Sequence, residues 1–124
     1  MMLYLPRADE LKTVSLRYLN VYAPRPDPKP EYASVIPQFF SNALVGKLLP
    51  IFGDGNQTMD FIFIVDIVEA TMLTAESKIV GSLEIASGDP VSANELAVTI
   101  KILADSYSET FYGKPRKGDI LHSV

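Results

Sequence analysis

Four prolines at every second position, Pro24, Pro26, Pro28 and Pro30, constrain the fold of this 124-residue chain more than any other feature. Proline lacks a backbone N–H and fixes φ at about −65°, so this spacing can continue neither a helix nor a central strand. The run is predicted to form an exposed loop with polyproline II character. It follows residues 11–22, LKTVSLRYLNVY, whose alternating β-branched and aromatic residues indicate a strand. That strand must end where the prolines begin.

After this loop, helical and strand patterns alternate. Residues 32–46 indicate a helix, because apolar side chains recur at helical spacing between a capping Ser34 and a terminal Gly46. The remaining patterns predict strands at 48–52, 60–65, 81–86 and 109–112, with turns at 53–56 and 87–90. They also predict a helix at 67–77 capped by Asp66, and a helix that begins at a capping box of Ser92 and Glu95 and ends at Ala104. This order indicates the mixed α/β class, with residues 1–10 unassigned.

Composition excludes several classes of protein. Hydrophobic residues make up 48% of the chain, enough for the core of one domain. A net charge of −4 without a basic stripe argues against nucleic acid as a partner. The lack of cysteine excludes disulfides and thiolate chemistry, and the single His122 excludes a multi-histidine metal site. The longest apolar stretch, 61–68, is far shorter than the roughly 20 residues that span a bilayer, so we expect a cytoplasmic protein without a membrane partner.

The residues alone form no obvious catalytic set. The sequence has neither a G-x-G-x-x-G motif nor a P-loop, and Gly53-x-Gly55 lies between two predicted strands, where a plain turn is expected. Four carboxylates lie in turns or at a helix start, which favours capping over acid–base chemistry; they are Asp54, Asp60, Asp66 and Asp89.

Two places remain open between a ligand role and a local structural one. Asn20 ends a strand directly before a loop, where α/β folds meet their ligands, but its amide could equally satisfy loop backbone. Arg116, Lys117 and Asp119 surround Gly118 in a basic loop, which suits either an anion site or a solvated surface.

Three segments, in order along the chain, resemble one known family. They are residues 16–25 (LRYLNVYAPR), 51–62 (IFGDGNQTMDFI) and 114–120 (KPRKGDI). At this spacing they resemble the second half of the extended short-chain dehydrogenase/reductase family, the NAD-dependent sugar-nucleotide epimerases and dehydratases, with the UDP-glucose 4-epimerase type closest. The resemblance implies that residues 11–124 are the substrate-binding portion of that fold.

The resemblance also implies a set of ligand contacts. Leu19 matches a residue that touches NAD near the nicotinamide, and Asn20 matches the amide that meets the diphosphate of the sugar nucleotide. The other matched positions contact a UDP-sugar: Ser34 and Val35 at a helix start, Pro50, Ile51 and Phe52 along the base, Phe61 beside the nucleotide, and Arg116 and Asp119 on the diphosphate or ribose. Met59 stands where the family has a phosphate-binding arginine, and Ala23 replaces a glycine, so weakened binding is expected.

The resemblance leaves the catalytic half of the family unmatched. The glycine-rich NAD motif is absent, and no tyrosine has a lysine four residues on, so we assign no catalytic residue and expect no NAD to bind this chain alone. We therefore expect a truncated, non-catalytic portion that binds nucleotide sugars. One alternative is an assembly module that forms homo-oligomers or complements a separate NAD-binding chain, because a strand at 14–21 would otherwise expose its edge. The other is an unrelated α/β domain with chance similarity.

Overall fold

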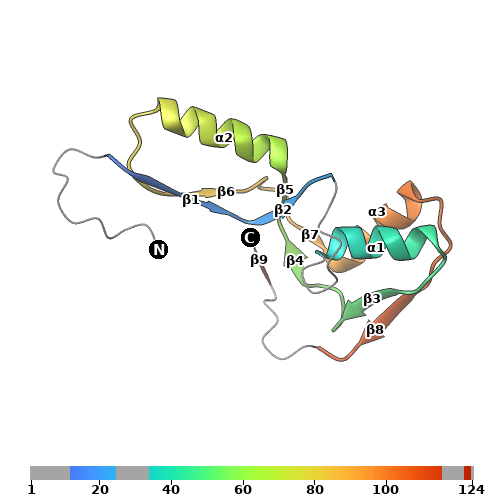
Figure 1. Cartoon of the computed structure of the whole chain (residues 1–124). Helices are drawn as coiled ribbons and strands as arrows, with labels where there is room; N and C mark the ends of the chain where they lie inside the picture. Colours follow the sequence, from blue (N-terminus) through green and yellow to red (C-terminus); the bar gives the residue numbers. More distant parts are fainter. Residues whose placement is uncertain (1–11, 25–33, 116–121, 124) are drawn as a thin grey trace.

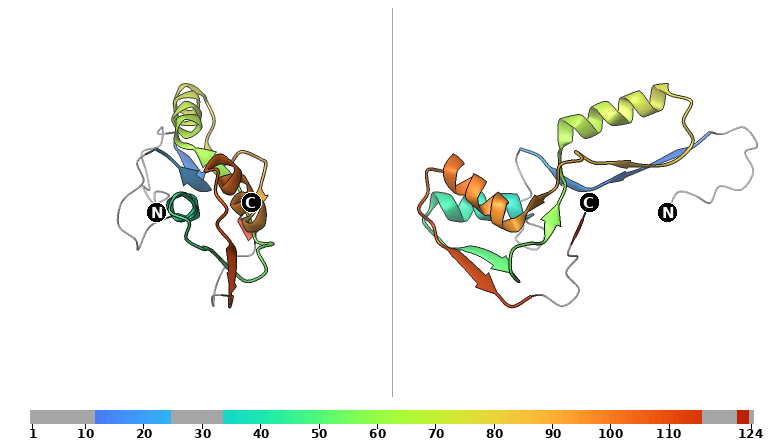
Figure 2. Two further views of the ribbon diagram at one scale, coloured as in Figure 1. Left: turned by 90° about the vertical axis from the view of Figure 1, so that its right-hand side faces the viewer. Right: turned by 180° about the vertical axis from the view of Figure 1, so that it is seen from behind.

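A computed structural model of the chain describes residues 12–24, 34–115 and 122–123. Figures 1 and 2 show an elongated molecule with one lobe at each end and short strands between them. One lobe holds β1, β6 and α2, and the other holds α1, α3, β3 and β8. The elements are β1 (Val14–Tyr18), β2 (Asn20–Tyr22), α1 (Val35–Leu44), β3 (Leu49–Phe52), β4 (Thr58–Met59), β5 (Phe61–Phe63), α2 (Ile64–Glu76), β6 (Gly81–Ile85), β7 (Val91–Ser92), α3 (Ala93–Leu103), β8 (Thr110–Gly113) and β9 (His122–Ser123).

The described strands pair mostly in parallel. β1 pairs with β6, β2 with β5 and β3 with β8, each as a two-stranded parallel sheet. β4 lies between β7, to which it is antiparallel, and β9, to which it is parallel. Each parallel pair joins distant parts of the sequence, such as Val14 with Gly81 and Leu49 with Thr110. The mixed α/β class predicted from the sequence is confirmed.

A hydrophobic core lies between α1, α3 and β3. It is formed by eight buried residues: Phe39, Ala43, Leu49, Ile51, Ala93, Leu96, Ala97 and Ile100. Helix α3 begins at the predicted capping box, in which Ser92 Oγ accepts the Glu95 N–H at 3.2 Å and Glu95 Oε2 accepts the Ser92 N–H at 2.8 Å. This box satisfies two backbone donors at the point where α3 enters the core.

The strand predicted at 11–22 is broken into two. β1 pairs with β6 in one lobe, whereas β2 pairs with β5 between the lobes, and Leu19 makes the change of sheet. The Leu19 N–H donates to the Ile85 carbonyl at 3.3 Å, and the next N–H, that of Asn20, donates to the Asp60 carbonyl at 3.2 Å. Pro24 lies in a bend just after β2, and the other three alternating prolines fall outside the described residues.

Helix α2 begins earlier than predicted. It starts at Ile64 with extended Phe63 as its N-cap residue, so the prediction that Asp66 caps this helix is wrong. Strand β5 runs directly into α2, which leaves no loop from which a side chain could cap it. Asp66 lies in the first turn, where a carboxylate favours the positive end of the helix dipole. None of the helices in the described ranges is long and apolar enough to cross a membrane.

Candidate functional site

Asn20 lies at the junction of the two lobes. Its Nδ2 donates to the Asp60 carbonyl at 3.0 Å and to Ser123 Oγ at 3.2 Å. The β2–β5 register places Asn20 opposite Phe61, so two positions matched to nucleotide-sugar contacts become neighbours. The half-buried Asn20 amide thus bonds a backbone carbonyl, which is the local structural role that the sequence left open. Asn20 is the first residue of β2, so the prediction that it ends a strand directly before a loop is wrong.

Asp60 ties this junction to the turn after β6. Its carboxylate is buried, with 2% of the residue exposed, and it accepts the N–H of Ser87 and the N–H of Gly88, both at 2.8 Å. Burial raises the pKa of Asp60, but hydrogen bonding from the backbone and side chain of Ser87 and from the backbone of Gly88 together lowers it more, so the pKa lies below its ordinary value. The Asp60 N–H also donates to the Ser123 carbonyl at 3.0 Å. A carboxylate held this way fixes structure, which agrees with the capping role predicted for it.

The turn at 53–56 forms as the sequence predicts. Gly53 and Gly55 have φ values of +86° and +79°, in the left-handed region that glycine tolerates best. Asp54 Oδ1 accepts the Asn56 N–H at 3.0 Å and closes an Asx turn. This backbone hydrogen bond from Asn56 lowers the pKa of the exposed Asp54 carboxyl.

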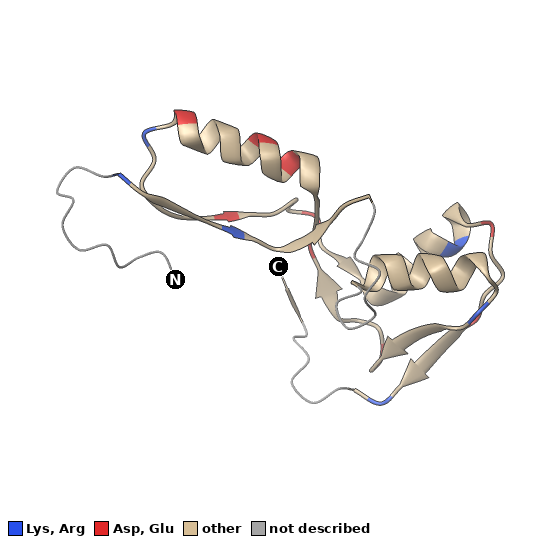
Figure 3. Ribbon diagram, viewed as in Figure 1, with Lys and Arg blue, Asp and Glu red and all other residues tan. Residues whose placement is uncertain are grey.

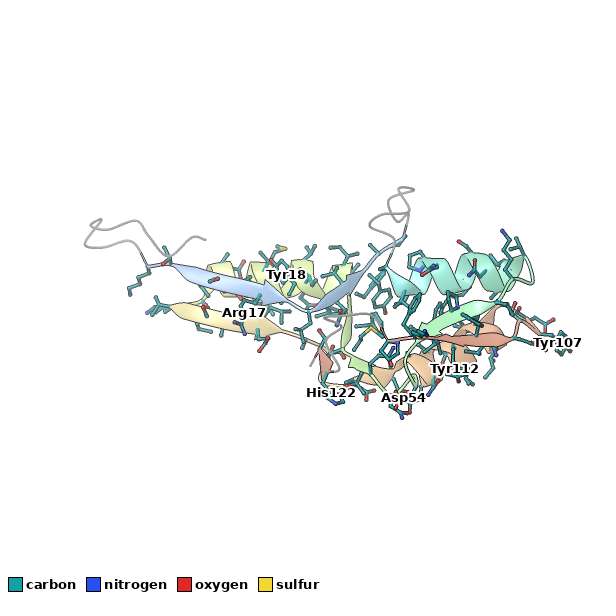
Figure 4. All side chains as sticks on the ribbon, turned by 90° about the horizontal axis from the view of Figure 1, so that it is seen from below. Arg17, Tyr18, Asp54, Tyr107, Tyr112 and His122 are labelled. Atoms are coloured by element: carbon teal, nitrogen blue, oxygen red, sulfur yellow. The ribbon has the colours of Figure 1, made fainter. Side chains whose placement is uncertain are left out.

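The same turn is held against the start of α3. The Asn94 N–H donates to the Gly55 carbonyl at 3.1 Å, and Asn94 Nδ2 donates to the Asp54 carbonyl at 3.1 Å. Tyr112 of β8 completes the group, because its hydroxyl donates to Asn94 Oδ1 at 2.9 Å. Asp54 and Tyr112 are both labelled in Figure 4. These contacts fix the segment that leads from β3 to Asp60.

Replacing Gly55 with alanine is expected to destabilise the chain by roughly 2–4 kcal/mol, because the new Cβ, at a positive φ, would push the Asn94 side chain out of its hydrogen bonds with Asp54 and Tyr112. Chemical denaturation measures the change. Gly46→Ala is the matched control, since Gly46 also has a positive φ, +68°, but nothing within 4 Å of its Cβ position. We expect about 1 kcal/mol for the control. Equal losses in the two variants would contradict the close approach of Asn94.

Several implied ligand positions surround the hydrophobic core. Val35, Met59 and Phe61 are partly buried and pack against it from α1, β4 and β5. Ser34 occupies the N-cap position of α1 with extended backbone, although its side chain makes no capping hydrogen bond. Leu19 is half-buried where the chain passes from β1 to β2.

The three positions implied on β3 do not share one face. Ile51 is 2% exposed and lies in the core, so only its backbone could meet a ligand. Pro50 and Phe52 are half-buried and alternate with it. Arg116 and Asp119, the two charged positions implied on the diphosphate or ribose, lie outside the described residues.

Strand β9 contributes residues that the sequence did not reveal. His122 Nδ1 and Thr58 Oγ1 are 2.9 Å apart, and Ser123 contacts both Asn20 and Asp60. A strand of two residues has no periodicity to detect. Among the described residues, no three histidine, aspartate or glutamate side chains gather as a metal site.

Comparisons with known proteins fit this architecture. The NAD dependent epimerase/dehydratase family matches residues 1–85. A UDP-N-acetyl-alpha-D-glucosaminuronate decarboxylase of Bacillus cytotoxicus is 41% identical over 100 residues, which cover 80% of this chain and 31% of that protein.

Two solved structures align with most of the chain. The UDP-N-acetylglucosamine 4-epimerase of Methanobrevibacter ruminantium, in complex with UDP-N-acetylmuramic acid, is 41% identical with a TM-score of 0.86. The UDP-glucose 4-epimerase of Thermotoga maritima, with UDP-glucose, is 37% identical with a TM-score of 0.82. Each alignment covers 92% of this chain and 37% of the other, so the chain spans about a third of the length of its relatives. This chain belongs to the NAD dependent epimerase/dehydratase family.

Proposed function

We propose that this chain is the nucleotide-sugar-binding portion of a UDP-sugar 4-epimerase-type enzyme and that it does not catalyse epimerisation by itself. The observation that carries this proposal is the pairing of Asn20 with Phe61 at the junction of the lobes, since both positions match UDP-sugar contacts in the family. Two relatives that align with 92% of the chain are described with UDP-N-acetylmuramic acid and UDP-glucose. A UDP-sugar is therefore the proposed ligand.

The chemistry of the matched positions suits a uridine diphosphate. Helix α1 begins at Val35 without an acidic side chain in its first turn, so its N-terminal N–H groups can attract a diphosphate. Pro50 and Phe52 provide half-buried rings on β3, and such rings suit a flat base. The Asn20 amide supplies a polar group at the lobe junction.

Catalysis needs parts that the sequence does not contain. Epimerisation in this family passes a hydride through NAD and requires a general base at a sugar hydroxyl. The 124 residues contain neither the glycine-rich motif nor a Tyr-x-x-x-Lys pair. We therefore assign to this chain the binding of the substrate and not the hydride transfer.

Met59→Arg is expected to tighten UDP-glucose binding roughly tenfold to hundredfold, because a guanidinium would add a bidentate, charge-assisted contact to the diphosphate. Isothermal titration calorimetry measures both proteins. The matched control is Ile102→Arg, the same gain of charge at an exposed position of α3. Glucose 1-phosphate, which lacks the uridine and one of the two phosphates, is the control ligand.

Two outcomes would contradict the proposed function. One is the absence of UDP-glucose binding by both the parent and Met59→Arg, with circular dichroism showing that each is folded. The other is formation of UDP-galactose from UDP-glucose by the purified chain supplied with NAD, which would assign catalysis to it.

A second candidate function, an assembly module, has separate support. Helix α2 exposes more than half of Val65, Val68 and Met72 to solvent. Contiguous exposed apolar surface marks interaction sites more often than it occurs by chance. In this role the chain would form homo-oligomers or complement a separate NAD-binding chain.

A further inference from the structure

Asp60 joins three separate segments of the chain at the junction of the lobes. Its carbonyl accepts the Asn20 N–H at 3.2 Å and Asn20 Nδ2 at 3.0 Å, and its own N–H donates to the Ser123 carbonyl at 3.0 Å. Its carboxylate accepts the N–H groups of Ser87 and Gly88, in the turn after β6, both at 2.8 Å. The backbone and side chain of one residue therefore bond to β2, to β9 and to that turn (Figure 1).

Asp60 closes this turn with a buried charge. Only 2% of the residue is exposed, and within the described ranges no cation pairs with its carboxylate. Removing a carboxylate from water costs free energy, which the two N–H donors offset. In return, a charged acceptor forms shorter and stronger hydrogen bonds than a neutral one. The carboxylate therefore holds the Asp60 backbone in one place more firmly than a neutral side chain could.

The Asn20 amide takes its orientation from this backbone. A carbonyl oxygen can only accept, so the amide nitrogen and not the amide oxygen must face the Asp60 carbonyl. The other Nδ2 hydrogen contacts Ser123 Oγ at a longer 3.2 Å, which makes this the contact that a ligand oxygen can replace. The Asp60 carbonyl is then the acceptor that keeps the amide in place when a ligand is bound.

The orientation of the amide matters because the strands at the junction offer only neutral donors. The strands that meet there, β2, β4, β5, β7 and β9, contain no lysine or arginine, and Figure 3 shows no blue residue on them. Hydrogen bonds weaken steeply when donor and acceptor are misaligned. A contact from the neutral Asn20 amide to a diphosphate therefore depends on an amide that is already held in the right orientation.

We propose that Asp60 is a positioning residue of the nucleotide-sugar site. Its carboxylate does not touch the ligand, because it is buried against the turn after β6. Asp60 acts instead through its carbonyl, which holds the Asn20 amide. This inference rests on the proposed function, in which Asn20 contacts the diphosphate.

Solvent exchange at the Asn20 side chain tests the positioning without any ligand. NMR is expected to show that the Asn20 Nδ2 protons exchange roughly two- to tenfold faster in Asp60→Asn than in the parent, as the weakening of one hydrogen bond predicts. The matched control is Ile100→Ala, which destabilises the chain by removing a buried side chain from the second half of α3. This control should leave the exchange at Asn20 unchanged.

Calorimetry with UDP-glucose tests the effect on the site. Asp60→Asn is expected to weaken binding roughly two- to tenfold. In the Asn20→Ala background the same change should cause no further loss of affinity, because the side chain through which Asp60 acts is gone. Ile100→Ala should leave the affinity of the folded chain unchanged. Asp60→Ser, which brings no NH2 group to the two N–H donors, replaces Asp60→Asn if circular dichroism shows that variant to be unfolded.

The outcomes separate this inference from the proposed function. Unchanged exchange at Asn20 in Asp60→Asn, or a loss of affinity that persists in the Asn20→Ala background, would overturn Asp60 as a positioning residue. Equal losses of affinity in Asp60→Asn and Ile100→Ala would do the same, because they would trace the effect to stability alone. If the parent does not bind UDP-glucose, the proposed function fails, and the exchange measurement still decides whether Asp60 holds the Asn20 amide.

Discussion

Asp60→Asn is expected to destabilise the chain by roughly 2–4 kcal/mol, because the N–H group of Ser87 or of Gly88 loses its charged acceptor and the buried position is left with an unmatched NH2 group. The asparagine Oδ1 can still accept one N–H, but its NH2 group would meet the other donor. The damage should reach beyond the turn, since the backbone of Asp60 also bonds Asn20 and Ser123. Hydrogen exchange at Ser87 and Gly88 should increase first.

The pH dependence of the free energy of unfolding at acid pH tests the same contact between Asp60 and the turn. Because the pKa of Asp60 is lower in the folded chain than the ordinary 3.8, an unfolded chain takes up the proton first. The stabilisation is therefore complete above about pH 4 and declines as the pH falls through the folded pKa. Asp60→Asn should lose this part of the pH dependence. Asp89→Asn, an exposed change in the same turn, is the control, and a similar flattening there would refute the assignment to Asp60.

Phe39→Ala is expected to cost about 3–5 kcal/mol, the usual range for removing a buried aromatic side chain. Phe39 is 1% exposed and lies in the cluster that joins α1 to α3 and β3. A loss of this size is a large part of the stability of a small protein, so the lobe with α1 and α3 should unfold first. Denaturant titration with hydrogen exchange on α1 and α3 measures it.

The control for Phe39 is an aromatic side chain without a packing role. Tyr107 is 97% exposed between α3 and β8, so Tyr107→Ala should change stability by less than about 0.5 kcal/mol. Comparable losses at the two positions would show that the core is not where the structure places it.

Local patterns were sufficient for the elements with strong signals. The box of Ser92 and Glu95 begins α3 as predicted, because its hydrogen bonds join residues three apart. The turn at 53–56 also follows from its glycines, whose positive φ values need no distant partner.

Pairings between distant segments account for the differences between the predicted and the observed elements. The break at Leu19 depends on strands that lie much later in the chain, so the unbroken alternation of residues 11–22 hides it. The early start of α2 follows from β5, which joins it without a loop. Strands β4, β7 and β9 have two residues each and no period to detect.

The candidate site likewise combines residues that local patterns identified with contacts that depend on distant segments. Asn20 was identified as the last residue of a strand, whereas it is the first residue of β2, and its contact Ser123 is 103 residues away in the sequence and had no signal. Ile51 matched a ligand position, yet it is buried in the core, because side chains alternate along β3 and Ile51 lies on the opposite face from Pro50 and Phe52. Alternation along a strand predicts which side chains share a face, and only the packing of α1 and α3 decides which face is inside.

The parallel pairing of β1 with β6 has a consequence for the synthesis of this chain on the ribosome. Residues of β1 pair with residues 67 positions later in β6, so a ribosome must add that length before β1 can pair with β6. At roughly 5–20 residues per second, the wait is about 3–13 s. Through that interval β1 lacks β6 as a partner and is within reach of chaperones and of other nascent chains. Polysomes that translate this message therefore bring many copies of β1 close together before β6 has been synthesised.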